Sequence, residues 1–169
     1  SKDIYVLVSL MGRENFFKTT DGGISWKAVD GHPQNLRPNH AALSNDGNMY
    51  ISYGDNPGPW RMSRGAVWKF NIEECAWTDI TPEIPKGNDK YAMGYASITV
   101  DPNNPEHLLA CTFYRSRELG GEEIYRSLDG GKSWSDPVYV ADNIKDGAKT
   151  HSRPFVTTDA NGNVVVAWV

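Results

Sequence analysis

The chain lacks several features that define large functional classes. No apolar run approaches the roughly 20 residues of a membrane-spanning helix, and no segment shows a convincing amphipathic-helix pattern. Lysine and arginine do not cluster and the formal net charge is −4, so nucleic acid is not an expected partner. The chain also has no signal-peptide pattern, a feature that mature chains and fragments lack as well.

Cysteine and metal-binding patterns are scarce too. Cys75 and Cys111 fall in a predicted hairpin turn and a predicted strand of different repeats, which favours separate thiols over a disulfide. The four histidines have no ligand spacing. The segment 159–163 hints at a calcium loop, but Val164 stands where such a loop needs glycine, so we expect a hairpin turn. No nucleophilic-serine elbow is present, and we expect no metal and no cofactor.

Turn-forming and aromatic residues are plentiful. The chain contains 16 glycines, 10 prolines and 6 tryptophans, with 39% hydrophobic and 22% charged residues. This balance is typical of a turn-rich all-β protein.

Two segments share the pattern Ser/Thr-x-Asp-x-Gly-x-Ser-Trp. Its key positions are Thr19, Asp21, Gly23 and Trp26 in the first copy and Ser127, Asp129, Gly131 and Trp134 in the second. The pattern resembles the Asp-box of sialidase-type β-propellers, a hairpin turn in which the carboxylate accepts main-chain N–H groups and glycine supplies positive φ. The Trp ring is expected to pack against the neighbouring repeat. This is a strong indication of fold and a weak one of function.

A third, degenerate copy lies between these two. Trp68-Lys69-Phe70 leads nine residues later to Trp77, so the three closing tryptophans are 51 and 57 residues apart. A pattern of apolar strand, polar turn and apolar strand also recurs, at 41–51, 98–110 and 155–166. Such periods predict an all-β propeller of four-stranded antiparallel blades. A sandwich with chance similarity is the alternative.

About three blades fit into 169 residues, whereas closed propellers usually have ~4–8. Residues 1–169 are therefore expected to form a partial propeller, with blade repeats at approximately 1–30, 40–82 and 95–140 and the start of another at 152–169. Strand-like segments at both ends would leave unpaired edges, which predicts a longer protein or an assembly.

The two faces of such a propeller differ. The Asp-boxes and the short turns at 45–48, 101–107 and 159–163 share one face, which we interpret as structural. The longer segments, such as 54–65 and 114–122, share the other face. Function is expected on this second face, because irregular loops on a rigid scaffold commonly carry it.

The segment 53–60 is the most unusual of these loops. Its glycines and prolines stiffen it, and an aromatic residue beside carboxylate and amide groups suits sugar binding. The candidate substrate-binding residues are Tyr53, Asp55, Asn56 and Trp60, with Tyr114 and Arg115 at the same point of the next repeat. The alternative is that Trp60 caps the core.

The run from Asn48 to Pro82 resembles glycoside hydrolase family 74, the xyloglucan-cleaving endoglucanases and their relatives. The matching pieces, in order, are 49–55, 57–59, 65–70 and 77–82, followed by 101–105 and 124–127. The resemblance covers roughly residues 17 to 134 and fades after Trp134.

This resemblance implies two propellers facing across a cleft, with an aspartate pair acting as acid and base in an inverting hydrolysis. The family's catalytic aspartates lie in Asp-x-Gly-Gly-type segments followed by arginine, which this chain lacks. Asp21 and Asp129 belong to Asp-boxes on the wrong face, and Asp55 is the only other carboxylate considered for chemistry. No catalytic residue is identified. The implied partners are a xyloglucan-type or other β-glucan and the rest of the propeller or a second one, in an extracellular or periplasmic setting.

Two rival functions stay open. A sialidase needs an arginine cluster, which binds the substrate carboxylate, and a Tyr/Glu nucleophile pair. The sequence does not identify such a pair. The candidate arginines are Arg37, Arg61, Arg64, Arg115, Arg117 and Arg153. A non-catalytic propeller that binds proteins or glycans is the second alternative, supported by the lack of a catalytic pair.

Overall fold

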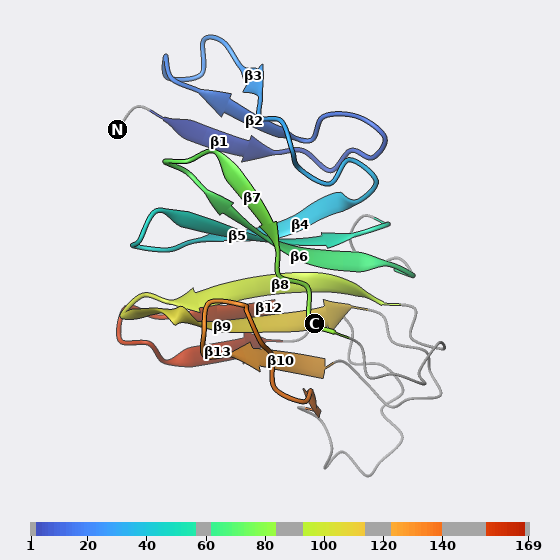
Figure 1. Ribbon diagram of the computed structural model, residues 1–169, viewed down its shortest axis with the longest axis vertical. Coiled ribbons are helices and arrows are strands. Elements are labelled where there is room, and N and C mark those ends of the chain that lie inside the picture. The colour runs from blue at the N-terminus through green and yellow to red at the C-terminus, as the bar shows by residue number, and fades with distance from the viewer. Residues whose placement is uncertain (1–2, 57–61, 84–92, 114–122, 140–154, 168–169) are drawn as a thin grey trace.

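The protein is a stack of small antiparallel sheets (Figure 1). The computed structural model describes residues 3–56, 62–83, 93–113, 123–139 and 155–167. These residues form thirteen strands, and no helix occurs among them. Within these ranges nothing has the length and hydropathy of a membrane-spanning helix. The expected all-β fold of antiparallel sheets is confirmed.

Each sheet is built from strands that follow one another in the chain. The first contains β1 (Ile4–Leu7), β2 (Phe16–Thr19) and β3 (Lys27–Ala28). The second contains β4 (Arg37–Leu43), β5 (Asn48–Gly54), β6 (Gly65–Asn71) and β7 (Ala76–Asp79). The third contains β8 (Gly94–Asp101), β9 (Asn104–Phe113), β10 (Glu123–Ser127) and β11 (Val138–Tyr139). The last contains β12 (Phe155–Thr158) and β13 (Val164–Ala167).

Two hydrophobic cores hold neighbouring sheets together. Between the first and second sheets lie Phe16, Leu36, Met49, Ile51, Tyr53, Ala66 and Phe70. Between the second and third lie, among others, Tyr50, Val67, Ile80, Tyr95, Ile98 and Tyr125. All seven residues of β5 are buried, because alternate side chains of this strand enter opposite cores.

The two Asp-box segments form turns with one hydrogen-bond pattern. In the second copy, the Asp129 carboxylate accepts the Ser133 N–H at 2.9 Å and the Ser133 hydroxyl at 2.6 Å. The Ser127 hydroxyl donates to Asp129 and accepts the Gly131 N–H at 2.9 Å. Gly131 has a φ of +89°, a conformation that glycine adopts without steric cost.

The first copy repeats these bonds. Asp21 accepts hydrogen bonds from the N–H and the hydroxyl of Ser25 at 3.0 and 2.6 Å. Thr19 is the equivalent of Ser127, and its hydroxyl accepts the Gly23 N–H at 3.0 Å. Hydrogen bonds from the Ser25 side chain and amide, with one from Thr19, hold the pKa of Asp21 well below its usual value. Both aspartates are thus fully used within their turns.

Tryptophans connect successive sheets. The Trp134 indole N–H donates to the Ile80 carbonyl at 2.7 Å, and the Trp77 indole N–H donates to the Asp30 carbonyl at 2.8 Å. Both acceptors follow closely after the last strand of the preceding sheet. The degenerate repeat at Trp77 therefore makes the same contact between sheets as the complete repeat at Trp134.

The remaining short turns also carry an aspartate that binds the main chain. Asp46 accepts the Asn48 N–H at 3.2 Å, and Asp101 accepts the Asn103 N–H at 2.8 Å. Asp159 accepts the N–H groups of Asn161 and Asn163 at 2.8 and 2.9 Å, in the hairpin between β12 and β13. The expected hairpin at 159–163 is confirmed.

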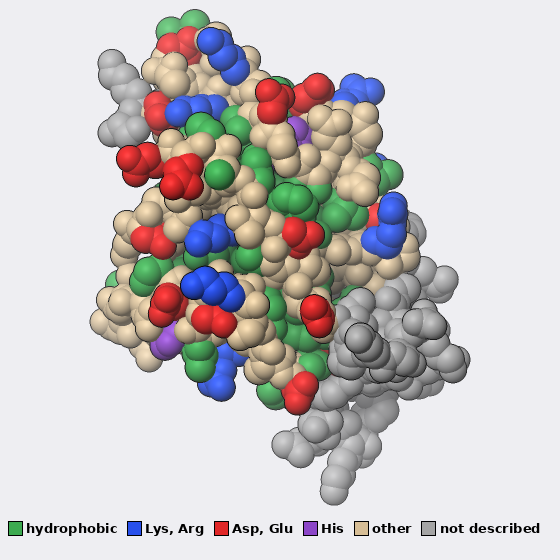
Figure 2. Space-filling model, in the orientation of Figure 1, with side chains coloured by type: hydrophobic (Ala, Val, Ile, Leu, Met, Phe, Trp, Pro, Cys, Tyr) green, Lys and Arg blue, Asp and Glu red, His purple; other side chains and the backbone are tan. Residues whose placement is uncertain are grey.

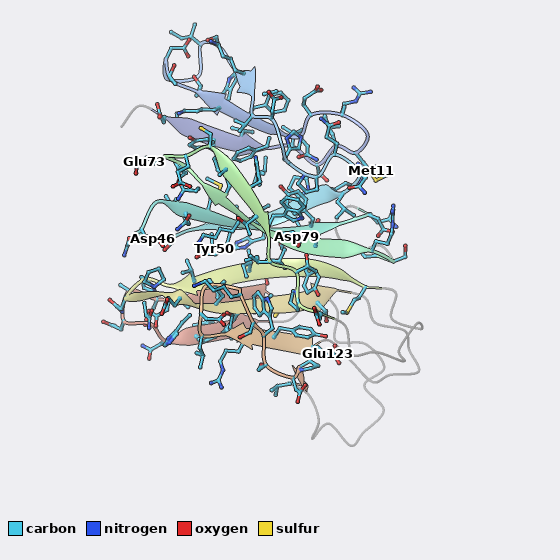
Figure 3. All side chains as sticks on the ribbon, viewed as in Figure 1. Met11, Asp46, Tyr50, Glu73, Asp79 and Glu123 are labelled. Atoms are coloured by element: carbon cyan, nitrogen blue, oxygen red, sulfur yellow. The ribbon has the colours of Figure 1, made fainter. Side chains whose placement is uncertain are left out.

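The strand ends lie at two opposite edges of the stack (Figure 1). The short turns lie on the left of the view, and we call this side the short-turn edge. Gly54, Gly65, Gly94 and Glu123 lie at strand ends on the opposite side, the long-loop edge. Figure 3 labels Asp46 and Glu73 at the first edge and Met11 and Glu123 at the second. Figure 2 shows acidic and basic side chains interspersed over the described part of one face.

Candidate functional site at the long-loop edge

The predicted substrate-binding residues divide into described and undescribed positions. Asp55 and Asn56 directly follow β5 at the long-loop edge and are half-buried. Tyr53 lies in the core between the first two sheets and is 0% exposed. Trp60, Tyr114 and Arg115 lie outside the described residues. Of the predicted set, the structure thus describes Asp55 and Asn56 at the edge itself and Tyr53 beneath it.

Asp55 closes the base of its loop. Its carboxylate accepts the main-chain N–H of Ser63 at 2.8 Å and also the Ser63 hydroxyl, while the Asp55 N–H donates to the Arg64 carbonyl at 3.0 Å. Partial burial raises the pKa of Asp55, but the hydrogen bonds from Ser63 outweigh it and lower the pKa below its usual value. The carboxylate is therefore ionised at neutral pH, and each of its oxygens binds Ser63.

Three glycines allow the second and third sheets to meet closely beneath this loop. Gly54 and Gly94 both pack against the Met62 thioether, so a side chain at either position would collide with it. A Cβ on Gly65 would lie 2.6 Å from the Tyr53 carbonyl oxygen. Gly65 thus lies against main chain, where a side chain has no room, whereas Gly54 and Gly94 contact the Met62 side chain beneath the loop that begins at Asp55.

Asn39 ties the same region to the third sheet. Its side-chain amide donates to the Tyr95 carbonyl at 2.9 Å and contacts the Met62 sulfur at 3.7 Å. Asn39 lies at a register shift in β4, between Pro38 and His40. A bulge of this kind re-aims a side chain, and here it turns the amide towards the neighbouring sheet.

His40 makes a second link between these sheets. Its Nδ1 donates to the Ile98 carbonyl at 3.0 Å. Burial lowers the pKa of His40, and the bond to Ile98 opposes this shift only in part. The neutral imidazole is therefore favoured, which suits a scaffold role.

Arg37 holds the first loop of the long-loop edge. One of its terminal N–H groups donates to the Ser9 carbonyl at 2.9 Å. Its Nε is buried and has no hydrogen-bond partner among the described residues. Since a guanidinium presents five donors, the group supports the 8–15 loop and retains unused donor capacity.

Glu123 is a carboxylate that the sequence patterns did not single out. It begins β10 at the long-loop edge, is 2% exposed, and accepts the Tyr125 hydroxyl at 3.2 Å (Figure 3). Its main-chain N–H donates to the Thr112 hydroxyl at 2.9 Å. The only feature of the sequence that could have pointed to Glu123 is its position as an acidic residue at the start of β10, a strand in which apolar and polar residues alternate.

Two carboxylates of the described part of the edge are thus held by hydrogen bonds within the protein. Asp55 and Glu123 are hydrogen-bonded within different sheets, by Ser63 and Tyr125 respectively. The Asp-box carboxylates Asp21 and Asp129 lie at the opposite edge and are occupied by their own turns. That these two aspartates are not catalytic stays a prediction.

Comparisons with known proteins point to one group of enzymes. No profile of a known protein family matches the chain. A xyloglucanase from Acetivibrio thermocellus is 39% identical over 137 residues, which are 80% of this chain and 16% of that protein. The solved structure of a glycoside hydrolase family 74 xyloglucanase from Xanthomonas campestris is 42% identical, with a TM-score of 0.72 over 83% of this chain and 19% of that one.

A sialidase from Streptococcus pneumoniae shares the fold alone, at 15% identity and a TM-score of 0.53. The chain spans less than a quarter of the length of each of these relatives.

Proposed function

The chain is homologous to a segment of the glycoside hydrolase family 74 enzymes, and on this basis we propose that it forms part of a xyloglucan-cleaving glycoside hydrolase. The similarity to xyloglucanases over four fifths of the chain is the observation that carries the proposal. Because the chain covers a small share of those enzymes, the activity belongs to a larger protein or assembly that includes this segment.

Within that enzyme, we assign the segment to the substrate cleft. The long-loop edge has a rigid base, formed by the Asp55–Ser63 bonds and the glycine contacts around Met62. A rigid base lowers the entropy that a loop loses when it binds a sugar. Asn56 and Trp60 follow directly on this base in sequence, and Tyr114 and Arg115 are their counterparts in the next repeat.

The four outer residues are the proposed sugar contacts. An aromatic ring such as that of Trp60 or Tyr114 covers the apolar face of a pyranose, while Asn56 and Arg115 bind hydroxyl groups. Asp55 and Tyr53 take supporting roles, because Asp55 is bound to Ser63 and Tyr53 is buried.

The acid–base pair of an inverting hydrolysis is proposed to lie outside this chain. Such a mechanism uses two carboxyl groups about 6.5–9.5 Å apart, with room for the attacking water between them. Asp21 and Asp129 serve turns at the short-turn edge, and each carboxylate oxygen of Asp55 already accepts a hydrogen bond from Ser63. An extracellular or periplasmic location follows from a polymeric substrate too large to enter a cell.

The rival functions find less support. The sialidase similarity extends to the fold only. A non-catalytic propeller is favoured only by the lack of a catalytic pair in this chain, whereas the similarity to xyloglucanases favours the hydrolase.

A tryptophan-fluorescence titration with xyloglucan oligosaccharides tests the proposal. Cellohexaose and sialyllactose serve as comparators, and Trp60→Ala identifies the responding residue. A saturable response to xyloglucan that Trp60→Ala abolishes, in folded protein, supports the cleft assignment. Equal responses to all three sugars, or none, would contradict it.

A further inference from the structure

A guanidinium group connects two loops of the long-loop edge. Arg37 begins β4 and pairs opposite Gly54, the last residue of β5, so it lies beside the strand end from which the Asp55 loop starts. Its side chain reaches the 8–15 loop of the first sheet, where a terminal N–H donates to the Ser9 carbonyl at 2.9 Å. Arg37 therefore lies between the 8–15 loop and the loop that carries the proposed sugar contacts.

The 8–15 loop, which receives this bond, is tied to the segment before β4. The Gly12 N–H donates to the Gln34 carbonyl at 2.7 Å. The Asn15 side-chain amide donates to the Leu36 carbonyl at 2.9 Å, and the Asn15 main-chain N–H donates to Nε2 of His32 at 3.0 Å. Because both the acceptor carbonyl and the start of β4 are held by these bonds, the guanidinium is positioned before any ligand arrives.

The charge of Arg37 is not neutralised within the described residues. Arg37 forms no ion pair with any carboxylate there. Asp55, which follows the residue opposite Arg37, is bound to Ser63 instead. Arg37 is half-buried: its bond to Ser9 is exposed to solvent, whereas its Nε is buried. The inner side of the guanidinium thus packs against protein, and its outer side presents N–H donors at the edge.

The surface around these donors is both polar and apolar. Met11, in the same 8–15 loop, is 41% exposed and lies at the long-loop edge (Figure 3). A pyranose carries hydroxyl groups around its rim and C–H groups on its faces, so it can use a guanidinium and a thioether side chain together. A simple anion would use the charge of Arg37 alone.

We propose that Arg37 binds a sugar unit of the xyloglucan chain, donating from its terminal N–H groups to hydroxyl oxygens beside the unit bound at Asn56. The inference rests on the proposed function and adds a subsite where the first and second sheets meet. Hydrogen bonds from a charged donor are stronger than those from a neutral one, and the planar guanidinium can bind two oxygens at once. Arg37 has a binding role and transfers no proton, because a guanidinium keeps its protons.

Titration of the full chain with a xyloglucan oligosaccharide, by calorimetry and by NMR of the arginine side-chain nitrogens, tests this contact. Arg37→Lys keeps the charge and a donor for the Ser9 carbonyl but loses the planar fork. Its affinity falls about tenfold, the effect of one lost hydrogen bond to a charged group, and its melting temperature stays close to that of the wild type. In the wild type, the Arg37 Nε signal shifts with saturation. Arg126→Lys, which changes an exposed arginine of the third sheet, is the matched control and leaves affinity unchanged.

Unchanged affinity of Arg37→Lys, in a chain whose wild type binds xyloglucan, overturns the inference and leaves the proposed function standing. An Arg37 Nε signal that does not move on saturation does the same, even if Arg37→Lys weakens binding, because Arg37 would then act only by supporting the 8–15 loop. A folded wild-type chain that binds no xyloglucan oligosaccharide overturns both the inference and the proposed function.

Discussion

The carboxylate of Asp55 accepts both the main-chain N–H and the hydroxyl of Ser63, which lies at the far end of the 56–62 segment. The sequence suggested Asp55 as a sugar contact. In the structure its hydrogen bonds to Ser63 instead join the two ends of the loop that carries Asn56 and Trp60 in sequence. The relationship makes loop geometry, rather than direct binding, the expected contribution of Asp55.

Asp55→Ala should weaken binding of xyloglucan oligosaccharides by about tenfold, equivalent to roughly 1.4 kcal/mol, because the loop loses its fixed base. The free energy of unfolding should fall by only about 1 kcal/mol, the typical net value of a hydrogen bond. Calorimetric titration and urea denaturation measure the two effects. Asp46→Ala, which removes a similar aspartate at the short-turn edge, is the matched control and should leave affinity unchanged.

The Asp-box turn at Asp129 should make stability depend on acid pH. Hydrogen bonds from the Ser133 side chain and amide, with that from Ser127, lower the pKa of Asp129 from 3.8 to about 2. A depressed pKa stabilises the fold above pH 3.8, and this contribution disappears as the pH falls towards 2. Melting temperatures of the wild type should therefore drop more steeply between pH 4 and pH 2 than those of Asp129→Asn. Parallel profiles for the two proteins would show that the turn does not titrate in this way.

Gly65→Ala should destabilise the protein by about 1–3 kcal/mol, the usual cost of overpacking. The added methyl group would collide with the Gly94 Cα on the third sheet and would lie 2.6 Å from the Tyr53 carbonyl oxygen on its own sheet. Gly130→Ala is a useful comparison, because its Cβ meets nothing within 4 Å and only its φ of +70° is unfavourable. Urea denaturation of both variants should give the larger loss for Gly65→Ala.

Trp77→Phe should lower stability by about 1 kcal/mol through the lost hydrogen bond, plus the loss of part of the packing against Phe70. The indole N–H of Trp77 bonds the Asp30 carbonyl, and its ring centroid lies 4.5 Å from that of Phe70. Trp26→Phe should cost less, since Trp26 is 42% exposed and makes no such bond within the described residues. Equal losses in thermal denaturation would contradict the assignment of the contact to Trp77.

Local patterns allowed much of the fold to be predicted from the sequence. In the Asp129 turn, hydrogen-bonded residues are at most four positions apart, so its composition alone indicates its hydrogen bonds. The degenerate repeat at Trp77 could be found because its spacing to the aromatic pair at Trp68 is preserved.

The candidate site was less accessible to sequence reasoning because its contacts join distant segments. Gly94 packs against Met62, and Asn39 binds the Tyr95 carbonyl, 56 residues away. Tyr53 lies next to a loop in the sequence. Both faces of β5 pack into hydrophobic cores, so the Tyr53 ring is buried in the core between the first and second sheets. Glu123 is buried by its neighbours on other strands, which no local pattern reveals.

NMR chemical-shift mapping with a xyloglucan oligosaccharide tests whether the long-loop edge forms part of a glucan cleft. We expect the amide signals of Asn39, Asp55, Asn56 and Ser63 to shift with saturation, while those of Asp46 and Asp129 at the short-turn edge stay in place. Shifts confined to the short-turn edge, or no shifts in a folded protein, would contradict the assignment of the long-loop edge to a glucan cleft.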